Sequence, residues 1–318
     1  MNPTAKKILV NTLKCLLSIG ILLFIVHKFN VQWTALSDLI AEPIWIGVAV
    51  FLSLAVVTTL ANNRWKSFLG MIGVKESFWR LVCLNWKSGF LGLMIPSSQG
   101  YDVLRIYNIE KAHPESRGKV GSTVIVERII GMICLIFIAL IALMFVGEGS
   151  FVWPIMILIA IIAAIVFVVR NQWCAKKINA LMESSRFMPK ASAYILKLYN
   201  GLHTFPFDGR LVWSIFLILM LQLSNILVVY CLFRACGCNV SLVYHLLYQP
   251  VISVITLIPI TFGGIGLREG GFTYFYTPLG VEPGVLIAVS LAYYCIMTLL
   301  PALLGGVVYW TELVKTKK

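Results

Sequence analysis

Long apolar segments separated by short polar ones make up most of this chain. A helix needs about 20 apolar residues to cross the hydrocarbon core of a bilayer. Six segments approach or exceed that length, at residues 8–29, 44–61, 122–146, 151–169, 211–233 and 284–310. The pattern predicts an all-α polytopic membrane protein with about six full transmembrane helices, in which residues 1–318 form a single integral membrane domain.

Two further apolar segments, residues 78–95 and 242–258, do not fit the pattern of simple crossing helices. The first contains Arg80 and Lys87, which are costly in lipid, and the second is interrupted by Pro250. We therefore consider for each segment both a full crossing and a re-entrant path that returns to the side it entered.

Both of these segments end in a stretch whose backbone cannot stay helical. Proline lacks the amide hydrogen that a helix interior needs, and glycine is too permissive to hold a helical turn. Irregular backbone at membrane depth is tolerated only where protein buries it or where it lines a watery cavity. We therefore predict two re-entrant hairpins. Their key backbone positions are Pro96, Gly100, Pro259, Gly263, Gly264 and Gly266.

The two irregular stretches match each other in sequence. Each runs Ile-Pro, then a hydroxyl residue, then glycine, and ends in Leu-Arg with the arginine nine positions after the proline. Each also lies between two long apolar segments, as expected of an internal repeat in a transporter. The match predicts an inverted repeat whose units cover approximately residues 44–146 and 211–310.

The distribution of positive charge favours the re-entrant path. The chain carries 26 lysine and arginine residues against 13 acidic ones, a net charge of +13. If both short segments re-enter, 21 of the 26 basic residues lie on one side, which the positive-inside rule makes the cytoplasmic side. This topology places both termini in the cytoplasm and a cytoplasmic interfacial segment at approximately residues 170–210. We expect a multi-pass protein of the cytoplasmic membrane.

Composition and motifs argue against several other classes of protein. Nucleic acid is a poor partner, because no soluble basic domain is present to bind it. The sequence has no G-x-x-x-x-G-K-S/T loop, so ATP is not the expected energy source. Cys236 and Cys238 form a lone C-x-C, a weak metal signal, and we expect neither metal nor cofactor. Tryptophans at span ends, including Trp65 and Trp213, are interpreted as an interfacial belt.

Charged side chains within the third span are candidates for function. Glu127 and Arg128 lie inside residues 122–146, and intramembrane charges mark functional sites by default. Neighbouring helical residues point about 100° apart, so we expect each to find a partner elsewhere. They either bind or gate a substrate or form an ion-pair network that holds the hairpins in place, and the two roles are compatible.

Arg105 and Arg268 are the strongest candidates for substrate binding. Each follows a glycine-containing break and opens a new helical limb, where backbone amides and the helix dipole favour an anion. A guanidinium adds bidentate geometry suited to phosphate. The alternative for Arg105 is that it only marks the cytoplasmic edge of the membrane. The other candidate substrate-binding residues are Glu269, Asp102, Glu127, Arg128, Lys87 and Arg64.

Four motifs together resemble the lysylphosphatidylglycerol synthase transmembrane region family, also called the flippase-like domain family. They are Asn63-Arg64-Trp65-Lys66, Pro96-Ser97-Ser98 with Gly100 to Arg105, Glu127 to Gly131, and Pro259 to Gly270. The chain departs from the usual pattern at Tyr101, where a second glycine is common, and at Thr261, where serine is usual. These departures leave the headgroup preference open.

The resemblance implies a lipid translocase that moves an anionic or phosphate-linked lipid and is not an enzyme. The membrane domain of the multiple peptide resistance factor is similar and translocates aminoacylated phosphatidylglycerol, but only eight residues follow Trp310 here, too few for its synthase domain. The implied partners are a membrane lipid and, in the alternatives, a lipid-linked glycosyltransferase or a lipid synthase. The alternatives are a polyprenyl-phosphate-sugar flippase, a lipid-modifying enzyme with Glu127 or Glu269 as general base, and an accessory subunit. The sequence leaves the oligomeric state open.

Overall fold

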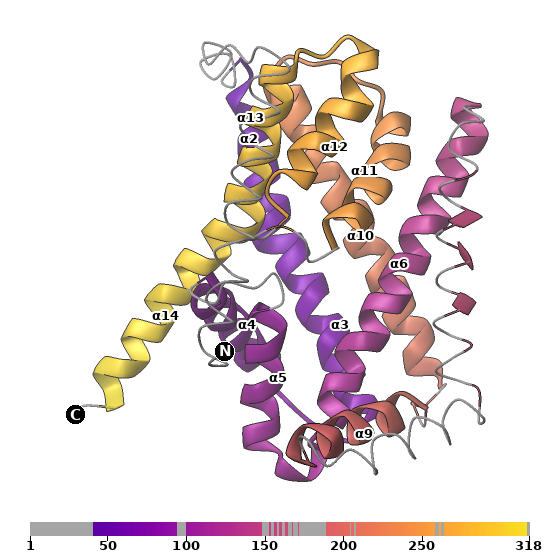
Figure 1. The fold of residues 1–318 in the computed structure, drawn as a ribbon. Coiled ribbons are helices and arrows are strands. Elements are labelled where there is room, and N and C mark those ends of the chain that lie inside the picture. The colour runs from indigo at the N-terminus through magenta and orange to yellow at the C-terminus, as the bar shows by residue number, and fades with distance from the viewer. Residues whose placement is uncertain are drawn as a thin grey trace, which may run out of the picture. The chain divides into compact units, whose positions relative to one another are not determined.

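The structure is a computed structural model, drawn in Figure 1. It describes residues 41–93, 100–147, 189–203, 205–206, 208–257, 261 and 264–316, with scattered positions between 153 and 171. Within these ranges every regular element is a helix, because the long apolar segments satisfy their backbone hydrogen bonds internally. The prediction of an all-α protein is confirmed at this level.

Within the described ranges, four helices are long and apolar enough to cross a membrane: Pro43–Met71, Lys119–Val146, Gly209–Ala235 and Pro283–Glu312. They confirm four of the six predicted spans. The predicted span at residues 8–29 lies outside the described residues, as does most of the one at 151–169.

Two of these four helices are divided by a short π-helical segment. Residues Pro43–Met71 comprise α2 (Pro43–Phe51), η3 (Leu52–Val57) and α3 (Thr58–Met71). The last span comprises α13 (Pro283–Tyr294), η7 (Cys295–Leu299) and α14 (Leu300–Thr316). The hydroxyl of Ser53 in η3 donates to the carbonyl oxygen of Ile296 in η7 at 2.9 Å, so the two π segments contact each other.

Both ambiguous apolar segments are helices of 16 residues, α4 (Phe78–Leu93) and α11 (Leu242–Leu257). Sixteen residues extend about 24 Å at a rise of about 1.5 Å per residue, short of a hydrocarbon core of about 30 Å. A second helix follows each one, α5 (Gly100–Ala112) after α4 and α12 (Leu267–Tyr276) after α11. This order fits the predicted hairpins, whose re-entrant path and inverted relationship stay predictions.

The chain forms two compact units. The first unit contains the described residues of 1–57, 85–101 and 223–318, and the second contains those of 58–84 and 102–222. Each unit therefore draws on both halves of the sequence. The division into repeat units at 44–146 and 211–310 stays a prediction.

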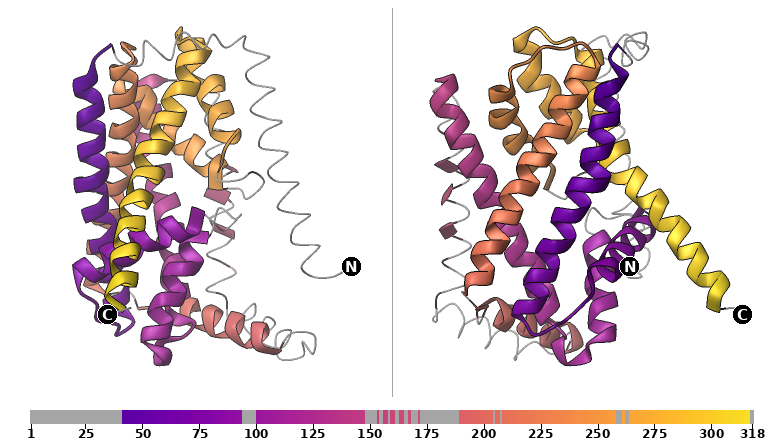
Figure 2. Two further views of the ribbon diagram at one scale, coloured as in Figure 1. Left: turned by 90° about the vertical axis from the view of Figure 1, so that its left-hand side faces the viewer. Right: turned by 180° about the vertical axis from the view of Figure 1, so that it is seen from behind.

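The core of the second unit packs α3 against α6 (Lys119–Val146) and the first half of α10 (Gly209–Ala235). Its fully buried side chains include Trp65, Phe68 and Leu69 of α3, together with Ile218 of α10. The helix α9 (Pro189–His203) lies crosswise at one end of α6 (Figures 1 and 2). Small residues let these two helices approach, since a Cβ added at Gly201 would lie 2.8 Å from Ser122 Oγ.

The first unit is built around an aromatic cluster formed by α10, α11 and α12. Four of its side chains are fully buried: Phe233, His245, Phe272 and Tyr276. The Tyr276 hydroxyl lies 3.0 Å from His245 Nδ1. Figure 1 shows α11 and α12 side by side. The cluster fixes the helical limb that carries Arg268.

The helices α4 and α14 pack closely within the first unit. A Cβ added at Gly305 would lie 1.9 Å from the carbonyl oxygen of Trp86, and one added at Gly89 would lie 3.9 Å from Ala302 Cα. Glycine and alanine at such contacts let helix backbones approach in a membrane, where packing replaces the hydrophobic effect as the driving force. The contact anchors the last two turns of α4 to the final span.

Candidate functional site

Five charged side chains meet in the second unit and are called the five-charge cluster here. Helix α3 supplies Arg64, α5 supplies Asp102 and Arg105, and α6 supplies Glu127 and Arg128. Arg105 Nη2 lies 2.9 Å from Asp102 Oδ1 and 3.3 Å from Glu127 Oε1. Arg64 also pairs with Glu127, and Arg128 pairs with Asp102. Arg105 therefore bridges the two carboxylates, each of which has a second arginine.

Helical spacing explains how the cluster forms. Asp102 and Arg105 are three positions apart on α5 and so share one face. Glu127 and Arg128 are neighbours on α6 and point in different directions, so Glu127 meets Arg64 and Arg105 while Arg128 meets Asp102. Arg64 reaches the cluster because its helix is longer than the predicted span. The predicted apolar segment ended at residue 61, but the helix that begins at Pro43 continues to Met71.

Most of the five-charge cluster is buried. Arg105 is 3% exposed, Asp102 and Glu127 are each 6% exposed, and the Arg128 side chain is 35% exposed, which makes Arg128 the most exposed member of the cluster. The guanidinium of Arg105 also lies 4.8 Å from the ring centroid of Trp65, a cation–π contact. The interpretation of Trp65 as an interfacial residue was wrong, because its ring is fully buried against Arg105 and the core.

The formal charges of the cluster do not cancel. Among the ion pairs of the described residues, each of the three guanidinium groups has a carboxylate partner, but the cluster contains only two carboxylates, so its formal charge is +1. A single negative charge, such as that of a phosphate diester, would complete the balance.

A smaller cluster lies in the first unit, at the start of α12. Arg268 Nη2 lies 2.9 Å from Glu269 Oε1, and the Ser290 hydroxyl of α13 donates to the same oxygen at 2.7 Å. Arg268 Nε donates to Ser290 Oγ at 2.7 Å, and its guanidinium lies 5.3 Å from the Tyr294 ring centroid. Glu269 Oε2 accepts the Gly266 amide at 2.6 Å. This Arg268–Glu269 cluster is buried and formally neutral.

Positive φ angles explain two of the glycines before Arg268. Gly264 has φ +78° and Gly266 has φ +90°, a region that L side chains rarely adopt. The amide of Gly266 points at Glu269, so the backbone turn and the ion pair depend on each other. Gly100 is the first residue of α5, while Pro96, Pro259 and Gly263 lie outside the described residues.

Lys87 forms an ion pair with a residue that belongs to neither arginine cluster. Its Nζ lies 2.7 Å from Glu312 Oε2 of α14, and the Glu312 side chain is 54% exposed. The structure thus brings Arg64, Asp102, Arg105, Glu127 and Arg128 into one cluster and Arg268 with Glu269 into another, and it gives Lys87 a different partner.

Sequence reasoning missed Ser290 and Tyr294 as partners of Arg268. The two residues are four positions apart and therefore share one face of an apolar helix. A hydroxyl and a phenol on one stripe of a span are the signal that would have identified them.

The structure also describes the C-x-C pair. Burial, together with the neighbouring Cys238 thiol, raises the pKa of Cys236 to about 12, so this thiol is protonated at neutral pH. Among the residues that the structure describes, no three His, Cys, Asp or Glu side chains gather as a metal site.

Comparison with known proteins gives a consistent result. The model of the family described as the lysylphosphatidylglycerol synthase TM region matches residues 11–305. A UPF0104 membrane protein of Methanocaldococcus jannaschii is 24% identical over 277 residues, which cover 81% of this chain and 82% of that protein. Another, of Methanothermobacter thermautotrophicus, is 23% identical over 316 residues, covering 91% of this chain and 90% of that protein. No solved structure matches the chain.

Proposed function

This chain belongs to the lysylphosphatidylglycerol synthase transmembrane region family, and from that premise we propose that it is a lipid translocase of the cytoplasmic membrane. Its substrate is an anionic or phosphate-linked lipid whose phosphate binds first at one arginine cluster and then at the other. The observation that carries this proposal is that three arginines share two carboxylates in the five-charge cluster, which gives it a formal charge of +1.

The excess charge gives the five-charge cluster an affinity for a monoanion. Arg105 has five N–H donors in a planar fork, and a phosphate diester accepts two of them side by side. Arg128 is the most exposed arginine of the cluster and is therefore the first to meet a headgroup. Because the carboxylates already hold the arginines in place, the phosphate would find a preorganised site.

The Arg268–Glu269 cluster serves as the second position in this proposal. Because the pair is neutral, a phosphate reaching Arg268 has to compete with Glu269 for the guanidinium. A weaker second site favours release, which a translocase needs at the end of each cycle. The membrane potential supplies about 2.3 kcal/mol per charge for each 100 mV, enough to bias the direction of transfer.

The same geometry supports a translocase over a lipid-modifying enzyme. A general base needs a carboxylate that can reach the proton it removes. Glu127 accepts from two arginines, and Glu269 accepts from Arg268, Ser290 and the Gly266 amide. Both carboxylates form ion pairs, although Glu127 uses Oε1 alone and its buried Oε2 has no hydrogen-bond partner among the described residues. A polyprenyl-phosphate-sugar lipid carries the same phosphate diester chemistry and fits the same sites.

Transport in liposomes tests the proposal. The purified protein is reconstituted with fluorescent short-chain lipids of several headgroups, and protein-dependent quenching of the label reports movement between leaflets. We expect wild type to move a phosphate-bearing class and Arg105→Ala to lose that movement. Arg80→Ala is the matched control, because Arg80 lies in the same unit with a side chain that is 55% exposed. Equal rates for wild type and Arg105→Ala would overturn the proposal.

A further inference from the structure

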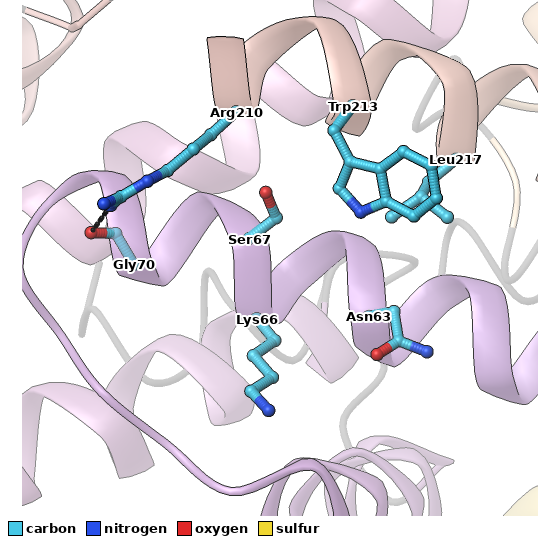
Figure 3. Close-up of a pocket in the computed structure, with 7 residues that line it drawn as sticks. All are labelled: Asn63, Lys66, Ser67, Gly70, Arg210, Trp213 and Leu217. Atoms are coloured by element: carbon cyan, nitrogen blue, oxygen red, sulfur yellow. Dashed lines mark hydrogen bonds between the residues drawn. The ribbon is translucent and has the colours of Figure 1, made fainter. Parts of the chain in front are cut away.

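A pocket of about 480 Å³ opens between α3 and α10 within the second unit. Its lining includes Asn63, Lys66 and Ser67 from α3 and Arg210 and Trp213 from α10 (Figure 3). These residues are separate from the five-charge cluster, which uses the opposite, buried side of α3. Lys66 is exposed while its neighbours Arg64 and Trp65 are buried, as the turn of about 100° per helical residue requires.

The pocket is basic. Lys66 and Arg210 are its charged residues, and its lining contains no carboxylate. Among the described residues, Lys66 has no hydrogen bond or salt bridge. Arg210 Nη1 donates to the Gly70 carbonyl oxygen at 3.1 Å, which holds the guanidinium across the pocket and uses one of its five donors (Figure 3).

The pocket lies where two membrane-spanning helices end. Helix α3 ends at Met71 and α10 begins at Gly209. Trp213 is 55% exposed, and a tryptophan beside cationic residues at a span end is typical of the headgroup level of a bilayer. Asp208 caps α10 by accepting the Arg210 and Leu211 amides, at 3.0 and 3.3 Å, so anion binding here relies on side chains.

A hydrogen bond joins the two helices that line the pocket. The hydroxyl of Ser214, which is fully buried, lies 2.9 Å from the Arg210 carbonyl oxygen, to which it can donate, and 2.8 Å from Ser67 Oγ, whose hydrogen it can then accept. The two helices are therefore joined at Ser67, which lines the pocket. A headgroup that bound Lys66 and Arg210 together would add a second link between α3 and α10.

We propose that this pocket binds the phosphate of an anionic membrane lipid at the bilayer interface, as a site distinct from the arginine clusters. Basic pockets between transmembrane helices near the membrane surface bind lipid headgroups in this way. The site depends on the second unit alone and does not require that the protein translocate lipid. Lipid bound there joins α3 to α10 and stabilises the packing that positions Arg64.

Native mass spectrometry of the full chain in detergent tests the site. The probes are phosphatidylglycerol, phosphatidylcholine and soluble glycerol 3-phosphate, each titrated against the protein. We expect the tightest phosphatidylglycerol site to weaken about 25-fold in the Lys66→Gln/Arg210→Gln variant, at roughly fivefold per charge. The control is Lys75→Gln/Lys111→Gln, which removes the same charge from exposed positions outside the pocket and should change the affinity less than twofold.

The other outcomes count against the site. Equal weakening in the two double variants would reduce the effect to general surface electrostatics. Binding of glycerol 3-phosphate as tight as that of phosphatidylglycerol would identify a site for free anions rather than for a lipid. Helix content and Tm in phosphatidylcholine confirm that each variant is folded. Transport is measured separately on the same variants, so the test of the lipid site is independent of the test of lipid translocation.

Discussion

The five-charge cluster and the Arg268–Glu269 cluster are built on matching sequence motifs but have different charge balances. Arg105 shares two carboxylates with two other arginines, which leaves one positive charge. Arg268 has one carboxylate to itself, and that carboxylate also binds the amide that opens α12. On the proposed function, this difference makes Arg105 the residue that takes up the anion, whereas Arg268 also binds within the turn that opens α12.

The largest expected effect is on stability, from Glu269→Ala. The change leaves Arg268 as a buried unpaired cation and removes the acceptor of the Gly266 amide. Breaking a buried pair in this way costs about 3–5 kcal/mol. We expect a large fall in Tm, measured in detergent.

Two comparisons make the Glu269 result specific. Glu312→Ala removes one partner of an exposed pair and should cost about 0.2–1 kcal/mol. The double variant Arg268→Ala/Glu269→Ala should lose less stability than the sum of the losses of the two single variants. Each single variant leaves one buried charge without its partner, whereas the double variant removes both charges. Additive losses would show that the two side chains do not stabilise each other.

The next effect is on transport, from Arg105→Ala. Removing this guanidinium leaves two cations and two anions, so the cluster becomes neutral and loses its excess charge. Loss of hydrogen bonds to a charged group amounts to about 1.5–3 kcal/mol, or roughly 10- to 150-fold in the transport rate. Initial rates of leaflet exchange in liposomes measure it.

The stability of Arg105→Ala sharpens the comparison. We expect its Tm to fall less than that of Glu269→Ala, because the remaining charges of the five-charge cluster still pair. If Arg105→Ala unfolds the protein while Glu269→Ala does not, the assignment of a binding role to one cluster and a structural role to the other is reversed.

Much of this arrangement follows from sequence, because apolar length and charge are local properties. The four described spans, the two short helices and the second helix after each are all readable from hydropathy, proline and glycine. The separate pairing of Glu127 and Arg128 follows from the direction of adjacent helical side chains. These features need no knowledge of tertiary contacts.

The remaining features depend on contacts that sequence does not encode locally. Arg64 reaches Glu127 because α3 stays helical beyond its apolar segment, where Trp65 and Phe68 are buried. Ser290 joins the Arg268–Glu269 cluster from a different helix. Charge balance is a sum over several helices, so the difference between the two clusters is visible only in three dimensions.

A smaller effect is expected from Gly266→Ala. At φ +90° an alanine is strained by about 1–3 kcal/mol, and the strain acts on the amide that Glu269 accepts. Gly47→Ala is the control, because that position is helical with open space around it, and alanine is favoured there by about 1 kcal/mol. The Tm of Gly266→Ala should be lower than that of wild type, and the Tm of Gly47→Ala should be unchanged or higher. Equal Tm values would mean that the turn before α12 does not require glycine.

The smallest effect is expected from Lys87→Ala, which tests whether every membrane-proximal cation contributes to transport. Lys87 pairs with the half-exposed Glu312 on α14, and such a pair contributes about 0.2–1 kcal/mol. The structure gives it no place in either arginine cluster, so its loss should change the transport rate less than twofold while Arg105→Ala abolishes most of it. A loss as large as that of Arg105→Ala would mean that the pathway runs along α4 and α14, and that the charge balance of the five-charge cluster does not select the substrate.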